Sequence, residues 1–372
     1  MCQPWRHPGQ HRQRLKPDTN RPRRTQLHHL IANRLLLLRL GLMFLVLLLT
    51  ATQCPQSDPA TPDPVQPPSP EPTIFLIPAI EPGDGTDLID QLLDTGIIRV
   101  GIRVWPEAAF APPAFRGFSN ATTGGALNGF EVDLAHLLAE GLGLELELIE
   151  AYPPVIASGD WRGEWDIAIA SLVPFDQPPE PSAGRAVSGL VFSEPYGYMP
   201  MGVLVPAGEN GIQSVGDLSG RKVGVLADSP YEQLLVAPRE EPLTVQGRPV
   251  LTVALPTDIE IVPESNLLKT IRLLGQPEGE ETTDVVAVIG PAPILQEAVN
   301  ADLPVKPVQA QYLGFQPLAV AAVPRDGLKV DRLMLEINTV LGRLQRRGIL
   351  AEVYQRWYQQ DLSRLPDSED RE

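Results

Sequence analysis

The sequence predicts an α/β fold in which parallel strands alternate with helices. Within residues 129–150, five apolar residues recur at helical spacing: Phe130, Leu134, Leu137, Leu138 and Leu142. Leucines at positions 144, 146 and 148 then alternate with glutamates, as in a half-exposed strand. The segment IIRVGIRV at residues 97–104 supplies a strand before this helix. A strand, a helix and a second strand in this order form a βαβ unit, whose two strands pair in parallel.

Further segments continue the alternation of strands and helices. IAIASL at residues 167–172 and GYMPMGVLVP at residues 197–206 read as strands, and a second α/β stretch follows them. FQPLAVAAVPRD at residues 315–326 supplies the strand that leads out of this stretch. A helix begins near Val330, because apolar residues recur at helical spacing beyond it. We expect this helix to end at Gly348 and residues 349–357 to form a last one.

Five short motifs occur in a set order along the chain. They are RVGI at 99–102, GFEVD at 129–133, FSEPY at 192–196, DLSGRKVGV at 217–225 and a closing helix that ends near Trp357. Their residues and order resemble the family 3 bacterial extracellular solute-binding proteins, the polar amino-acid receptors of ABC importers. The resemblance implies a two-lobed periplasmic-binding-protein fold (type II-like), in which each lobe is a mainly parallel sheet flanked by helices.

The resemblance also implies where the chain divides. The strands at 197–206 and 315–326 would be the hinge, and a ligand would lie between two lobes that close by hinge bending. The predicted parts are an export segment (1–54), a proline-rich tether (55–87), lobe 1 (88–198 plus 317–362), lobe 2 (203–312) and an acidic tail (363–372).

Residues 1–54 have the layout of a secretory signal. They contain nine basic residues and one acid, and an uninterrupted run of twelve apolar and small residues occupies positions 40–51. Cys54 follows this run and resembles the lipidated cysteine of a bacterial lipoprotein, which would place the protein on a membrane in the periplasm. The alternatives are an ordinary cleaved signal, a retained membrane anchor, and twin-arginine export through Arg23 and Arg24.

The segment after Cys54 is too rich in proline to fold regularly. Eight prolines between Cys54 and Thr73 exclude a helix or an interior strand. In polyproline geometry, at about 3.1 Å per residue, the segment would hold a folded domain roughly 50 Å from its anchor. A spacer directly after a lipidation site supports the anchored form of the protein.

Composition and charge narrow the function classes. The chain has a net charge of −16 although residues 1–54 are basic, so the part beyond residue 54 is strongly acidic. A surface of that sign argues against nucleic acid as a partner. Four of the five histidines lie in the first 29 residues, and His136 falls on the polar side of a predicted helix. We therefore expect no zinc site, no other metal and no cofactor.

A receptor for a small carboxylate needs a cation, hydrogen-bond donors and an apolar wall, because a buried carboxylate without partners is costly. In the family that this chain resembles, an arginine a few residues before FS-x-PY binds the ligand carboxylate. Arg185 precedes Phe192 at nearly that distance and is the leading candidate. An insertion before Arg185 leaves open that it is a surface arginine instead.

Ser229 and its neighbour Asp228 are candidates for a second ligand anchor. Ser229 as N-cap, Pro230 at the first helical position and Glu232 form a capping box. The N–H groups and the dipole at such a helix start favour an anion, and the hydroxyl of Ser229 and the charge of Asp228 could meet a ligand. The alternative is that these residues only cap the helix.

Other candidate contacts lie at the ends of two predicted strands. Ser171 takes the position of a ligand-contacting glycine in the family. Arg103, Trp105 and Phe110 follow the first strand, where the family often has an aspartate and an aromatic wall, and core packing is the alternative for both aromatic residues. Two departures from the family make the pocket less anionic. Arg103 replaces an acid, and Pro291 lies near the place of the family's ammonium-binding aspartate. We therefore expect an acidic amino acid or an organic acid as ligand.

These features predict a monomeric, extracytoplasmic substrate-binding protein that delivers a small solute to an ABC transporter permease. One alternative is a sensory or scaffold lipoprotein with a degenerate site. Another is a dehydratase, since enzymes that act on cyclic precursors of aromatic amino acids resemble these receptors. That chemistry needs a general acid, and only Glu107, Glu131 or Glu164 could serve. Nothing singles one of them out, so we do not expect an enzyme.

Overall fold

The computed structural model describes residues 79–105, 126–177, 189–237, 242–274, 284–308 and 312–366, together with the backbone of residues 115–116. Residues 74–372 form one compact unit of the chain. The predictions made for the export segment, Cys54 and the tether as far as residue 78 lie outside the described residues.

The first lobe is built on a parallel sheet in which β1 (Ile97–Ile102) lies between β4 (Glu145–Glu150) and β5 (Ile167–Leu172). α2 (Leu88–Thr95) leads into β1, and α3 (Phe130–Leu142) precedes β4. Acidic residues occupy the first turn of α3, and a glycine in the left-handed conformation ends it, its N–H bonding back to the last turn. The strand–helix–strand order predicted from the sequence is therefore confirmed.

The second lobe repeats this arrangement. β8 (Lys222–Leu226) lies between β11 (Glu260–Glu264) and β12 (Val285–Pro291), and both pairings are parallel. One helix follows each of these strands: α5 (Pro230–Val236), α6 (Leu267–Leu273) and α7 (Ala292–Asn300). Each lobe thus has a parallel three-stranded core with helices beside it, as a βαβ pattern predicts.

Two long antiparallel strands join the lobes. β7 (Gly197–Pro206) pairs with β14 (Gly314–Ala322), from the pair of Gly197 and Leu318 to the pair of Met201 and Gly314. β7 also pairs with β12 of the second lobe, and β14 pairs with β5 of the first. The result is one continuous path of strands in the order β11-β8-β12-β7-β14-β5-β1-β4. The predicted two-lobed fold with mainly parallel sheets and connecting strands is confirmed, whereas the lobe boundaries stay a prediction.

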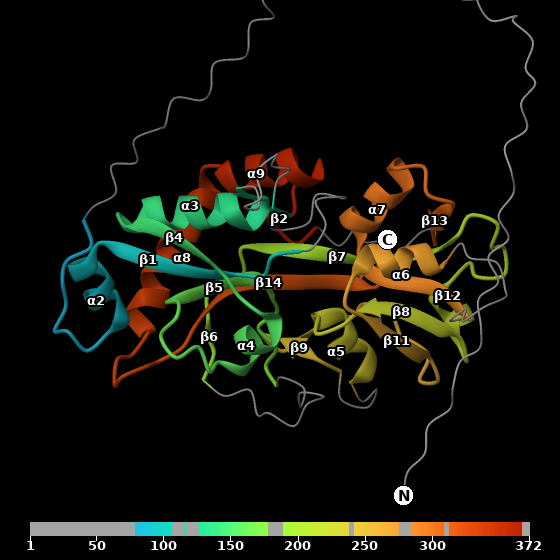
Figure 1. Cartoon of the computed structure of the whole chain (residues 1–372), viewed down its shortest axis with the longest axis horizontal. Helices are drawn as coiled ribbons and strands as arrows, with labels where there is room; N and C mark the ends of the chain where they lie inside the picture. The colour runs from blue at the N-terminus through green and yellow to red at the C-terminus, as the bar shows by residue number, and fades with distance from the viewer. Residues whose placement is uncertain are drawn as a thin grey trace, which may run out of the picture. The chain divides into compact units, whose positions relative to one another are not determined.

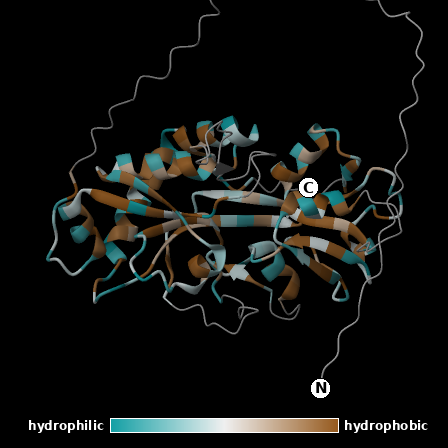
Figure 2. Ribbon diagram, in the orientation of Figure 1, coloured by the Kyte–Doolittle hydropathy of each residue, from teal (hydrophilic) through white to brown (hydrophobic). Residues whose placement is uncertain are grey.

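The last two helices return to the first lobe. α8 (Asp331–Arg346) and α9 (Ile349–Tyr358) pack against α3, and in Figure 1 α3 and α9 lie above the sheet while α4 (Pro153–Ser158) and α5 lie below it. Apolar residues concentrate on the strands and on the helix faces turned to them (Figure 2). The helix predicted to start near Val330 and the one predicted for residues 349–357 are both present.

Several short elements surround these strands. They are β2 (Phe115–Arg116), β3 (Leu127–Asn128), β6 (Val191–Phe192), η1 (Val215–Leu218), β9 (Thr244–Val245), β10 (Arg248–Pro249) and β13 (Val305–Pro307). β6 adds to the edge of β14, and β9 and β10 form a hairpin between α5 and β11. No helix among the described residues is long and apolar enough to cross a membrane.

Candidate functional site

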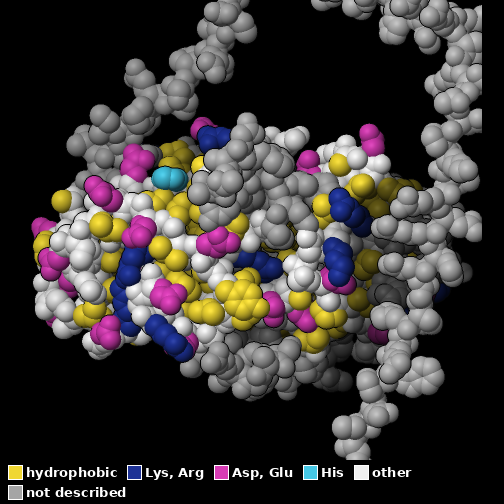
Figure 3. All heavy atoms as spheres, viewed as in Figure 1, with side chains coloured by type: hydrophobic (Ala, Val, Ile, Leu, Met, Phe, Trp, Pro, Cys, Tyr) yellow, Lys and Arg dark blue, Asp and Glu magenta, His cyan; other side chains and the backbone are white. Residues whose placement is uncertain are grey.

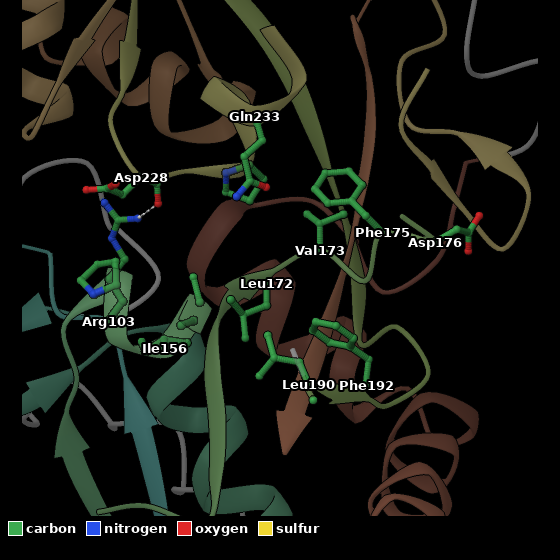
Figure 4. Close-up of a pocket in the computed structure, with 15 residues that line it drawn as sticks. Arg103, Ile156, Leu172, Val173, Phe175, Asp176, Leu190, Phe192, Asp228 and Gln233 are labelled. Carbon is green, nitrogen blue, oxygen red and sulfur yellow. Dashed lines mark hydrogen bonds between the residues drawn. The ribbon is translucent and has the colours of Figure 1, made fainter. Parts of the chain in front are cut away.

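A pocket opens between the lobes at the carboxyl ends of the first-lobe strands. It has a volume of about 320 Å³, which is within the range of small-ligand sites. The first lobe contributes residues after β1, β4 and β5 and around β6, and the second lobe contributes the start of α5 (Figure 4). Its lining is mostly apolar, with these polar exceptions among the described residues: Arg103, Asp176, Asp228 and Gln233.

Arg103 is the cation of this pocket. It stands directly after β1, and its side chain crosses from the first lobe to the second, where Nη1 donates to the carbonyl oxygen of Asp228 at 3.4 Å. The guanidinium lies 5.0 Å from the centre of the Trp105 ring, within cation–π range. It forms no ion pair with any described residue, and burial lowers its pKa. An arginine stays protonated in proteins, and the nearby carboxylates of Asp228 and Glu131 act against the effect of burial on its pKa without forming an ion pair with it.

Asp228 and Ser229 fulfil different roles at the start of α5. Asp228 is exposed and lines the pocket in a left-handed backbone conformation, and its N–H donates to Glu232 Oε2 at 2.8 Å. Ser229 is buried, its hydroxyl donates to the carbonyl of Leu226, and it caps the N–H of Glu232 at 3.4 Å. The N-cap predicted for Ser229 is present, but its hydroxyl proton is already used within the protein. α5 has only seven residues, which weakens the expected dipole at its start.

Ser171 lies under the pocket floor and its polar atoms are also engaged. Its N–H and its hydroxyl both donate to Glu131 Oε1, the hydroxyl at 2.8 Å. Its φ of +52° is in the left-handed region, which a non-glycine residue seldom adopts without support. The flanking residues Ala170 and Leu172 line the pocket, whereas Ser171 does not. Ser171 therefore shapes the floor that its neighbours form.

Glu131 organises this floor from the first turn of α3. It is 1% exposed, and Oε1 also accepts from the hydroxyl of Tyr196 at 3.0 Å. Oε2 has no hydrogen-bond partner among the described residues. Burial raises the pKa of Glu131, while its hydrogen bonds to Ser171 and Tyr196 act in the opposite direction. One buried carboxylate thus ties α3 to the end of β5 and to the residue before β7.

The site residues predicted from the sequence divide into three groups. Arg103 and Asp228 line the pocket together, whereas Ser171, Ser229 and Trp105 lie beside it. Trp105 is partly buried and packs against the apolar cluster of the second lobe. Arg185 and Phe110 lie outside the described residues, as does Glu107.

Sequence reasoning missed most of the apolar wall. Pro153, Ile156 and Ala157 of α4 form one part of it, and Leu190 and Phe192 form another. A signal for α4 was present, because two prolines directly follow the β4 strand, and the carboxyl ends of parallel strands are where ligands bind. The pairing of Glu131 with Ser171 had no such signal, since 40 residues separate them in the sequence.

The described residues contain no group of three or more His, Cys, Asp or Glu that could hold a metal ion. His136 is exposed on α3, as its position in the helical pattern predicts. On the face drawn in Figure 3, acidic and basic side chains are interspersed and no continuous basic surface is seen. Among the described residues, the site therefore offers one cation, a few hydrogen-bonding groups and an apolar wall.

Two α/β lobes joined by crossing strands, with such a pocket between them, define a two-lobed solute-binding protein. The chain belongs to the bacterial extracellular solute-binding proteins, family 3, whose family model matches residues 102–360. The family that the sequence motifs resemble is thereby confirmed.

Two relatives of known description are similar over most of their length, and a third over less than half of its own. The chain is 27% identical over 282 residues to the L-cystine-binding protein TcyJ of Escherichia coli K12. The matched region covers 74% of this chain and 88% of that protein. It is 25% identical over 278 residues to a probable amino-acid ABC transporter-binding protein of Haemophilus influenzae, with coverage of 74% and 90%. A membrane-bound lytic murein transglycosylase F of Desulfosudis oleivorans is 26% identical over 232 residues, but the match covers only 44% of that protein.

Solved structures show the same fold. The arginine-bound substrate-binding protein AbpA of Streptococcus pneumoniae matches with a TM-score of 0.53 at 20% identity, covering 73% of this chain and 99% of that one. The ancestral amino-acid-binding protein AncCDT-1, a precursor of cyclohexadienyl dehydratase, matches with a TM-score of 0.51 at 20% identity and the same coverage. At these identities the likeness establishes the fold alone.

Proposed function

We propose that this protein captures an amino acid or related acid with more negative charge than a neutral amino acid, and passes it to the permease of an ABC transporter. The observation that carries the proposal is Arg103, a partly buried cation in the interlobe pocket that forms no ion pair with a described residue. A charge removed from water is costly unless it is paired, and a ligand carboxylate would supply the partner. An arginine can hold that carboxylate through two parallel hydrogen bonds.

The other polar groups of the pocket fit the remainder of such a ligand. The exposed carboxylate of Asp228 stands beside Arg103 and could face an ammonium group. Gln233 adds an amide, and the wall around Phe192 and Ile156 would cover the carbon chain. Arg185 would be a second cation for the α-carboxylate. With Arg185 as the second cation, and with Asp176 already bonded to the hairpin of residues 244–249, a ligand with two carboxylates fits best.

The relatives support transport as the role of this binding. Two of them are described as an amino-acid ABC transporter-binding protein and an L-cystine-binding protein. L-cystine itself carries two carboxylates, so it belongs among the ligands to be tested. We further propose that Cys54 is lipidated and holds the protein, as a monomer, on the membrane in the periplasm.

Two of the three glutamates that could serve as a general acid do not line the pocket, and the third, Glu107, lies outside the described residues. Glu131 is buried beneath the floor with Oε1 accepting three hydrogen bonds, and Glu164 is exposed elsewhere, so neither lines the pocket. A general acid must reach the leaving group within hydrogen-bond distance. We therefore propose binding without chemistry, although the fold is shared with the precursor of a dehydratase.

The test is a thermal-shift and calorimetric screen of residues 74–372 against L-glutamate, L-aspartate, L-cystine, small dicarboxylates, L-arginine and L-lysine. A ligand at a hundred times its dissociation constant should add about 2.7 kcal/mol of stability. Tight binding of arginine or lysine with no binding of any acid would contradict the proposal. No binding at all would favour the sensory or scaffold alternative.

The contribution of Arg103 can be measured once a ligand is found. Arg103→Ala should weaken an acidic ligand about ten- to a hundredfold, because charge-assisted hydrogen bonds are lost. Arg103→Lys should restore part of the affinity, since lysine keeps the charge but not the two parallel bonds. The exposed Arg162, away from the pocket, provides the control Arg162→Ala, which should leave the affinity unchanged.

A further inference from the structure

The connection between α5 and β11 is longer than such connections usually are. It runs over residues 237–259, which is 23 residues, whereas connections between neighbouring strands and helices commonly have about two to six. Its described part includes the hairpin formed by β9 and β10. Residues 242–252 are called the arm below.

The base of the arm is attached to the start of the connecting strand β14. The N–H of Thr252 donates to the carbonyl of Leu313 at 2.8 Å, and Leu251 bridges to Gly314. Gly314 has a φ of +156°, and a Cβ atom there would lie 2.0 Å from the carbonyl oxygen of Val250. The backbones therefore approach too closely for any other residue. The arm is thus fixed where the chain passes between the lobes.

The tip of the arm is hydrogen-bonded to the first lobe, mainly at Asp176, and Gln246 Nε2 also donates to Glu194 Oε2 at 3.4 Å. Asp176 follows β5, and its N–H donates to the carbonyl of Thr244 at 2.8 Å. Its carboxylate accepts from the hydroxyl of Thr244 at 2.7 Å and from the N–H groups of Gln246 and Gly247, both at 2.8 Å. Four hydrogen bonds of good length therefore join one aspartate to a single hairpin.

Asp176 also stands at the edge of the ligand pocket. In Figure 4 it lies on the side of the pocket away from Arg103. The N–H of Gly247 and the hydroxyl of Thr244 lower the pKa of its carboxyl, so it is ionised while the arm is attached. Both oxygens of its carboxylate accept hydrogen bonds from the arm. Its contacts connect the two lobes across the pocket.

We propose that the arm is a clasp that holds the lobes closed, with Asp176 as the residue it grips. The arm belongs to a connection of the second lobe and its tip is bonded to the first lobe, so an opening motion that separates the tip from Asp176 breaks these hydrogen bonds. It favours the closed state and slows release of whatever solute the pocket holds. Asp176 acts as a positioning residue, because it stabilises the conformation that encloses the ligand without contacting it.

The test measures closure in the full chain without ligand. Spin labels at His136→Cys in α3 and Gln296→Cys in α7, with Cys2 and Cys54 replaced by serine, report the distance between the lobes. Asp176→Ala should lower the ratio of closed to open molecules about three- to tenfold, and Thr244→Val should lower it less. Asp217 is an equally exposed aspartate that accepts from Ser214 and Gln213 within one lobe. Asp217→Ala should therefore leave the ratio unchanged.

The pH profile separates the clasp from a general loss of folding. Because the pKa of Asp176 lies below its ordinary 3.8 when the arm is attached, the clasp is complete above pH 3.8 and weakens as the pH falls below it. The wild-type distances should lengthen over that range, whereas those of Asp176→Ala should not change with pH. Equal distances in wild type and Asp176→Ala, or an equal loss in Asp217→Ala, would overturn the proposal. Adding L-glutamate tests the proposed ligand separately, because the clasp is measured without it.

Discussion

Glu131 is the residue on which the pocket floor depends. Its Oε1 accepts three hydrogen bonds, two of them from Ser171 in its left-handed conformation. Glu131→Ala removes all three and leaves a cavity, so it should lower the free energy of unfolding by about 2–4 kcal/mol. Glu131→Gln keeps the accepting oxygen and should cost less. Chemical denaturation of both variants measures this, and equal losses would contradict the role given to the oxygen.

Glu131 also predicts a pH dependence of stability. Burial raises its pKa above the ordinary 4.5, so the folded protein holds this proton more tightly than the unfolded chain does. The resulting stabilisation is complete below pH 4.5 and is lost as the pH rises through the folded-state pKa. The stability of the wild type relative to Glu131→Gln should therefore decline above pH 4.5. Glu140→Gln, an exposed change on the same helix, should show no such trend.

Individual site residues were harder to predict than the fold. Arg103 was predicted as a contact because it follows the first strand, and it lines the pocket. Ser171 was predicted from its position at the end of a strand and Ser229 for its hydroxyl group, but in the structure their hydroxyl groups donate to Glu131 and to Leu226. Whether a hydroxyl is free depends on a partner far away in the sequence. A pattern of residues carries no such information.

At the level of elements, the close packing of α6 on β8 depends on one glycine, which leaves room for a side chain of the helix. A Cβ atom at Gly224 would lie 2.3 Å from Cγ2 of Thr270, which is buried on α6. Gly224→Ala should therefore lower the free energy of unfolding by about 1–3 kcal/mol. Thr270→Ser removes that methyl group but keeps the hydroxyl bonded to the Asn266 carbonyl. The double variant should recover part of the loss.

This prediction has a matched control within the same lobe. Gly208 has no atom within 4 Å of the place that a Cβ would take, so Gly208→Ala should change stability by less than about 0.5 kcal/mol. Thermal unfolding of Gly224→Ala, Thr270→Ser, the double variant and Gly208→Ala measures these changes in stability. If Gly224→Ala and Gly224→Ala/Thr270→Ser were equally unstable, the methyl contact would not be the cause.

At the scale of the whole molecule, hydrophobic periodicity predicted the individual strands and helices, but it did not predict how the strands of the two lobes join into one path. β5 and β7 were predicted with the bounds they have, because each is a largely apolar segment. The two-lobed order of strands came from resemblance, since no local pattern says that β14 pairs with both β7 and β5. The arm was missed because its hairpin strands have two residues each.

The first lobe is assembled from distant parts of the chain, and Asp166 holds three of them together. Its buried carboxylate accepts from the N–H of Arg99 at 2.7 Å and from the Arg99 guanidinium at 2.8 Å, and it is ion-paired with Arg325, which follows β14. Asp166→Ala leaves two arginines without this partner, so the free energy of unfolding should fall by about 3–5 kcal/mol. The exposed pair of Arg162 and Asp160 provides the comparison, and Asp160→Ala should cost about 0–1 kcal/mol. Hydrogen exchange should become faster in β1 and β5 while β8 and β12 keep their protection. Equal acceleration in both lobes would show that the lobes unfold as one unit rather than separately.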